Sequence, residues 1–126
     1  MKPRHIVAGV LAAALALPLG VPTAAAADAQ SKYKLRGLGA MECSKYLEDR
    51  RADIKGTQSY ADWFTGYLTA YNFMTAQTYD IAPSHDANGL LTYLDLYCTK
   101  NQATKIGQAA AQFVKAVYEK RQTAAE

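Results

Sequence analysis

Two cysteines, Cys43 and Cys98, follow an N-terminal segment with the features of an export signal, and this combination constrains the fold most strongly. Residues 1–27 carry a basic start, an apolar stretch and a run of alanines, which is the pattern of a secretory signal peptide cleaved near Ala27. The apolar stretch is too short to span a bilayer comfortably. The mature chain is therefore expected to have no membrane span and to fold outside the cytoplasm, where paired cysteines oxidise.

A disulfide matters more in a small domain than in a large one. Signal cleavage leaves about 100 residues, enough for one domain with a limited core. Bonding Cys43 to Cys98 closes a loop of roughly 56 residues, for which the chain-entropy model gives roughly 4 kcal/mol of stability. The alternative, two free buried thiols, is less consistent with an exported chain.

Charge argues against a nucleic-acid partner. The formal charge of +3 falls by two when Lys2 and Arg4 leave with the signal, and the remaining acids and bases are interspersed. Proteins that bind nucleic acid through their phosphates usually carry a basic face or a long basic tract.

The mature chain begins with a segment that lacks apolar periodicity. We expect residues 28–40 to be a flexible leader, followed by a short helix over residues 41–52. A second helix is indicated from Ser59, as its N-cap, to about Gln77 or Tyr79. Its apolar side chains recur every three or four residues. They are Tyr60, Trp63, Phe64, Tyr67, Leu68, Tyr71 and Met74 or Thr75.

Two further helices follow a polar loop. Ser84 or Asp86 caps the third helix, and Asn101 lies where it can cap the fourth, expected over residues 103–121. The expected buried positions of the third helix are Ala87, Leu90, Leu91, Leu94, Tyr97 and Cys98. Those of the fourth are Ile106, Ala109, Ala110, Phe113, Val114 and Val117.

These elements predict an all-α fold. It is a small four-helix orthogonal bundle, with one short and three longer helices, stapled by one disulfide. The helical domain is expected over residues 41–122, and residues 123–126 should fray. Gly66 and Ala70, four residues apart, are expected to allow close approach of a neighbouring backbone.

In this arrangement the chain resembles the HdeA/HdeB-like superfamily of small periplasmic helical proteins. The resemblance covers roughly residues 41–117 and rests on features in a fixed order. These are Cys43, the run from Trp63 to Leu68 with Tyr71 and Asn72, the pair Tyr97 and Cys98, Asn101, and Ala109 to Ala111. Where relatives often carry proline after the asparagine, this chain has Gln102.

The resemblance implies a non-enzymatic, periplasmic protein-binding domain, and two roles remain open. One is an acid-stress holding chaperone, whose partners are unfolded periplasmic clients and which can form a homodimer. The other is an immunity protein that inhibits a secreted toxin of a type VI system, such as a peptidoglycan amidase. A fold alone does not decide between such roles.

Candidate binding residues come from the aromatic surplus and the longest loop. Some tyrosines exceed what a small core can hold, and a ring with a polar tip suits an interface. We expect a partner or dimer surface that includes Trp63, Tyr67, Tyr71, Tyr93, Asp80, His85 and Asp86.

Catalytic chemistry finds little support in the sequence. His85 is the one histidine of the mature chain, and its neighbours Ser84 and Asp86 are better explained as a helix-capping loop than as a triad. One histidine with scattered aspartates lacks the spacing of a metal site. We expect no catalytic residue, metal or cofactor.

Overall fold

The computed structural model describes residues 27–30, 32–53 and 55–126, and residues 1–26 of the predicted signal peptide lie outside them. The chain divides into two units, Met1–Tyr33 and Lys34–Glu126. In the described part of the first unit, the Asp28 carboxylate accepts hydrogen bonds from the backbone N–H groups of Gln30 and Lys32, at 3.0 and 2.8 Å. These bonds close a local turn.

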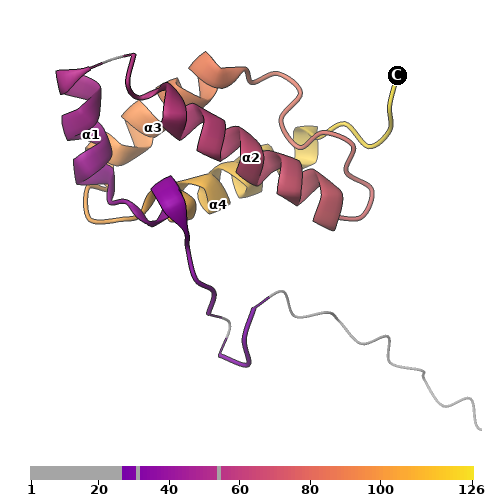
Figure 1. The fold of residues 1–126 in the computed structure, drawn as a ribbon. Helices are drawn as coiled ribbons and strands as arrows, with labels where there is room; N and C mark the ends of the chain where they lie inside the picture. The colour runs from indigo at the N-terminus through magenta and orange to yellow at the C-terminus, as the bar shows by residue number, and fades with distance from the viewer. Residues whose placement is uncertain (1–26, 31, 54) are drawn as a thin grey trace, which may run out of the picture. The chain divides into compact units, whose positions relative to one another are not determined.

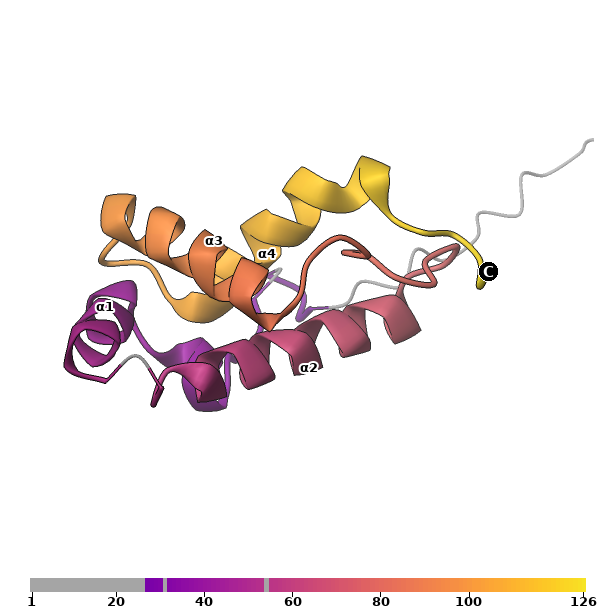
Figure 2. The same ribbon diagram turned by 90° about the horizontal axis from the view of Figure 1, so that it is seen from above.

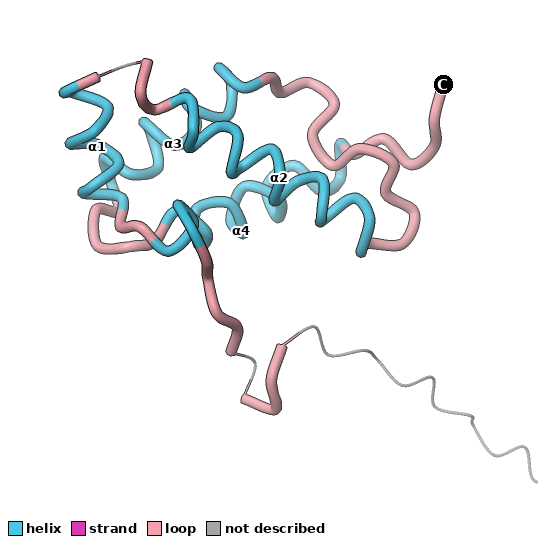
Figure 3. The backbone as a smooth tube through the Cα atoms, in the orientation of Figure 1, coloured by secondary structure: helices cyan, strands magenta, loops and turns pink. Residues whose placement is uncertain are grey.

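The second unit is helical, which confirms the predicted all-α class (Figure 1). Its elements are η1 (Gly37–Ala40), α1 (Cys43–Ala52), α2 (Gln58–Met74), α3 (Ala87–Lys100), α4 (Ile106–Val117) and η2 (Tyr118–Lys120). The longest connection between helices joins α2 to α3 and is drawn as a pink loop in Figure 3. No helix in the described part of the chain has the length and apolar character needed to cross a membrane.

The helices pack in a bundle around one core. Seen from above, α2 forms one side, while α3 and α4 form the other and α1 lies at the end beside α3 (Figure 2). Helix α3 packs against α1, α2 and α4, so it is the central element of the bundle.

The predicted apolar stripes supply most of the core. Phe64, Leu94 and Phe113 are among the largest fully buried side chains. Burial of such a side chain contributes about 1.5–3 kcal/mol. Met74 differs from the prediction, because it projects into solvent at the end of α2.

The disulfide forms as predicted. Cys43 at the start of α1 is bonded to Cys98 near the end of α3, with the two Cα atoms 4.9 Å apart and both residues fully buried. Backbone bonds at the same end join α1 to the segment before α4: Cys43 N–H donates to the Thr104 carbonyl and Ile106 N–H to the Met41 carbonyl. Helix α1 is thus anchored to both α3 and α4.

Two of the predicted helix caps differ in the structure, and one forms as predicted. Helix α2 follows Thr57, and the Ser59 hydroxyl donates to the Gly56 carbonyl instead of capping the helix. Asp86 does cap α3, since its carboxylate accepts from Gly89 N–H at 2.8 Å. Asn101 ends α3 rather than starting the next helix, because its amide donates to the Tyr97 carbonyl.

The expected flexible leader ends earlier than residue 40. Residues 37–40 form η1, which packs on α2 and α4. The indole Nε1 of Trp63 donates to the Arg36 carbonyl at 3.1 Å, and Gly39 is buried. The first helical element of the domain therefore begins at Gly37, four residues before the predicted start at residue 41.

Close backbone approach occurs at a glycine other than the predicted one. Gly66 is exposed, and a Cβ placed there meets nothing within 4 Å, so the expected contact at Gly66 and Ala70 is wrong. A Cβ on Gly39 would instead overlap the indole ring of Trp63. Glycine is required at position 39 because η1 lies directly on that ring.

These two glycines give a matched pair of substitutions. Gly39→Ala should destabilise the domain by about 1–3 kcal/mol, because the indole and η1 must move apart. Gly66→Ala should stabilise it by up to about 1 kcal/mol, since alanine is favoured in an exposed helix interior. Guanidinium unfolding measures both changes. A Gly39→Ala protein as stable as the parent would show that η1 does not pack on Trp63.

Candidate functional site

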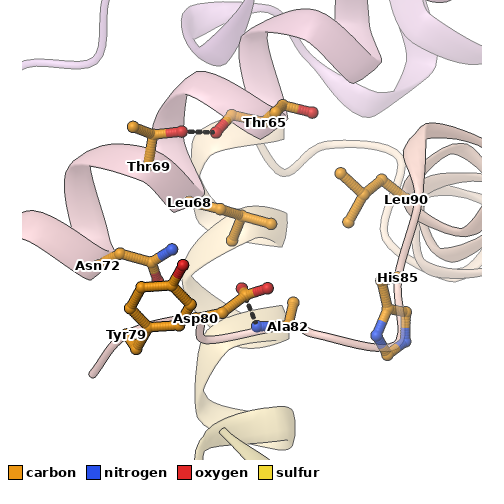
Figure 4. A pocket seen from close by; sticks show the side chains of 9 residues that line it. All are labelled: Thr65, Leu68, Thr69, Asn72, Tyr79, Asp80, Ala82, His85 and Leu90. Carbon is orange, nitrogen blue, oxygen red and sulfur yellow. Dashed lines mark hydrogen bonds between the residues drawn. The ribbon is translucent and has the colours of Figure 1, made fainter. Parts of the chain in front are cut away.

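A groove of about 340 Å³ lies between the C-terminal half of α2, the loop before α3 and the first turn of α3 (Figure 4). Leu68, Ala82 and Leu90 supply its apolar lining. Polar side chains supply the rest: Thr65, Thr69, Asn72, Tyr79, Asp80 and His85. An apolar surface with a few converging polar groups is the usual form of a binding site.

The loop that forms one wall of the groove is held in place by hydrogen bonds. Asn72 Oδ1 on α2 accepts from Ile81 N–H at 2.8 Å. The C-terminal segment bonds to the same loop, because Tyr79 and Asp80 N–H donate to the Gln122 carbonyl and Gln122 N–H donates back to the Asp80 carbonyl. Ile81 is fully buried below these bonds. The loop is therefore a fixed wall of the groove.

The structure separates the predicted surface residues into two groups. Asp80 and His85 line the groove, whereas Asp86 uses its carboxylate to cap α3. The His85 ring lies edge-on against Phe113, with ring centroids 5.0 Å apart. The loop thus contributes two neighbouring polar groups to one site and one to helix capping.

The aromatic residues of the predicted surface are partly buried and pack mainly on the core. Trp63 stacks on Tyr67 at 5.8 Å between ring centroids and lies against η1. The Tyr93 hydroxyl donates to the Ala109 carbonyl at 3.2 Å, and burial raises the pKa of Tyr93 to about 12. Tyr71 is also packed against the core. These four rings are therefore partly buried against the core and do not form a free aromatic surface.

A second polar cluster joins α1 to α3 and the start of α2. Asp95 accepts from the Tyr46 hydroxyl at 2.7 Å and from the Arg50 guanidinium at 3.1 Å. Asp49 accepts from Lys45 at 2.6 Å and from the Tyr60 hydroxyl at 2.8 Å. This cluster holds α1 against its neighbours and is structural in its arrangement.

The sequence analysis missed the most exposed apolar side chains, Phe73 and Met74. They are 87% and 75% exposed at the end of α2. Phe73 lies nine positions, about two and a half turns, beyond the buried Phe64, so the helical period already places it on the opposite face. Met74 falls on the predicted stripe but is the last residue of α2, where its side chain is exposed. Tyr79 and Leu96 are also exposed, at 56% and 65%.

No family model, no curated protein and no solved structure matches this chain. The likeness to HdeA/HdeB-like proteins thus remains a hypothesis from the sequence. Among the described residues, no group of three or more His, Cys, Asp or Glu side chains is placed to hold a metal ion.

The Asp49 contacts predict how the domain responds to acid. Hydrogen bonds from Lys45 and from Tyr60 lower the pKa of Asp49 below its ordinary value. A carboxyl group with a lowered pKa in the folded state stabilises the fold above its unfolded-state pKa. That contribution is lost as the pH falls through the folded-state pKa.

Asp49→Asn should therefore lower the melting temperature at neutral pH and have progressively less effect below about pH 4. Glu48→Gln is the matched control, because Glu48 is an exposed neighbour whose oxygen lies 3.5 Å from the same lysine. Thermal unfolding from pH 7 to pH 2 measures both. An Asp49→Asn effect that does not change with pH would contradict this account.

Proposed function

We propose that this chain is a non-enzymatic protein-binding domain of the periplasm. The exposed pair Phe73 and Met74, beside the groove that begins at Thr65 on the same helix, carries the proposal. Aromatic and methionine side chains are enriched in protein interfaces. Covering each of these two side chains with a partner contributes about 1.5–3 kcal/mol.

An acid-stress holding chaperone is the first candidate role, in line with the family resemblance. A holding chaperone needs apolar surface for unfolded clients, and the exposed Phe73 and Met74 side chains offer it. It also needs contacts that acid weakens. The Asp49 carboxylate joins α1 to Tyr60 of α2 by a hydrogen bond, and protonation in acid removes the charge of this carboxylate. A homodimer through the exposed apolar pair is compatible with this role.

An immunity protein is the alternative role, and the groove is the observation that favours it. Inhibition of one secreted effector, such as a peptidoglycan amidase, needs a surface whose shape is set before binding. The loop carrying Tyr79 and Asp80 has this property, because α2 and the C-terminal segment both bond to it.

Light scattering of an acid-denatured client protein at pH 2 to 3 separates the two roles. A holding chaperone should suppress scattering, and Phe73→Ser/Met74→Ser should lose most of the suppression. Leu96→Ser is the control, since it removes one exposed apolar side chain from a different helix.

Absence of protection at excess protein would exclude the chaperone role. An equal loss in Leu96→Ser would show that general apolar exposure, not the Phe73–Met74 pair, binds the client. If the parent protein gives no protection and binds no secreted cell-wall enzyme in a direct titration, the protein-binding proposal fails as a whole.

A further inference from the structure

Of the described residues that line the groove, Asp80 is the one that carries a carboxylate, and none is a lysine or an arginine. Among the described residues, Asp80 makes no salt bridge. Arg121 lies in the segment that pairs with the same loop, but its guanidinium donates to the Gln77 and Tyr118 carbonyls. It also stacks 3.9 Å over the Tyr118 ring. Within the part of the chain that the structure describes, no lysine or arginine therefore pairs with the Asp80 carboxylate.

Backbone groups fix the orientation of two polar side chains that line the groove, Asp80 and Asn72. Asp80 Oδ1 accepts from Ala82 N–H at 2.9 Å, which leaves Oδ2 for a ligand (Figure 4). Asn72 Oδ1 accepts from Ile81 N–H, so the amide nitrogen of Asn72 is the group available to a ligand carbonyl. The groove therefore presents an oriented anion, an oriented donor and the half-exposed Tyr79 ring.

Each side-chain class fits this surface differently. An acidic side chain would be repelled by Asp80, and a purely apolar one would bury the carboxylate without a partner. A basic side chain satisfies both parts, because its aliphatic stem can lie on Leu68, Ala82 and Leu90 while its charged end reaches the carboxylate. Arginine fits better than lysine, since its planar guanidinium can donate to the remaining carboxylate oxygen and at the same time stack on an aromatic ring.

We propose that this groove is the socket for an exposed arginine side chain of the protein partner. The guanidinium binds Asp80 Oδ2 and lies on the Tyr79 ring, and the Asn72 amide donates to a partner backbone carbonyl. This inference rests on the proposed protein-binding function and adds the chemistry of the residue that is recognised.

Amide chemical shifts in NMR titrations test the socket directly. The probes are the blocked tripeptides acetyl-Gly-Arg-Gly-amide, the lysine analogue and the glutamine analogue. The arginine peptide should give saturable shifts confined to residues 65–72 and 78–90. The glutamine peptide should bind at least about tenfold more weakly, because it lacks the charge-assisted hydrogen bond.

Asp80→Asn is the decisive variant, because asparagine keeps the oxygen that accepts from Ala82 N–H. It should weaken arginine binding by about tenfold or more without lowering the melting temperature. Asp62→Asn, on the exposed face of α2 and outside the groove, is the matched control and should bind as the parent does.

Three results would overturn the socket. They are equal binding of the arginine and glutamine peptides, unchanged binding by Asp80→Asn, and absence of shifts in the groove at any peptide concentration used. Tighter binding of the lysine peptide would replace arginine as the recognised residue. If the peptide titrations fail but the protein still protects a client or binds an effector, the arginine socket is excluded and the proposed protein-binding function is retained.

Discussion

The disulfide between Cys43 and Cys98 is the constraint on which the rest of the structure depends. Helix α1 has 10 residues, which is too short to be stable alone in water. The bridge fastens it to α3, the helix that contacts all the others. With α1 in place, Tyr46 and Arg50 bond to Asp95 on α3. The disulfide and the polar cluster therefore hold the same two helices, α1 and α3, together.

Much of the fold could be predicted from the sequence, because the apolar side chains of a packed helix recur at a regular spacing. Phe64, Leu94 and Phe113 fall on predicted stripes and are buried. The helix boundaries were harder to predict, since a cap depends on contacts with residues outside its own helix. Thr57 shows why: Arg50 donates to its hydroxyl at 3.1 Å, a contact that no local pattern encodes. The packed η1 was missed because it depends on the close approach of Gly39 to Trp63.

The candidate site was only partly predictable. Asp80 and His85 were expected at a surface because they lie in the longest polar loop, and the structure places both in one groove. What turns the loop into a fixed wall is nonlocal, namely the bond from Ile81 to Asn72 and the pairing with Gln122. The groove and the apolar pair at the end of α2 both depend on a bundle held together by one covalent bridge.

Guanidinium unfolding of the mature protein, before and after reduction, tests that dependence most directly. The account predicts no titratable thiol in the native oxidised protein and a loss of roughly 4 kcal/mol in unfolding free energy on reduction. Cys43→Ser/Cys98→Ser should reproduce the loss without reductant. Two reactive thiols in the protein as exported, or an unfolding midpoint that does not change on reduction, would contradict it.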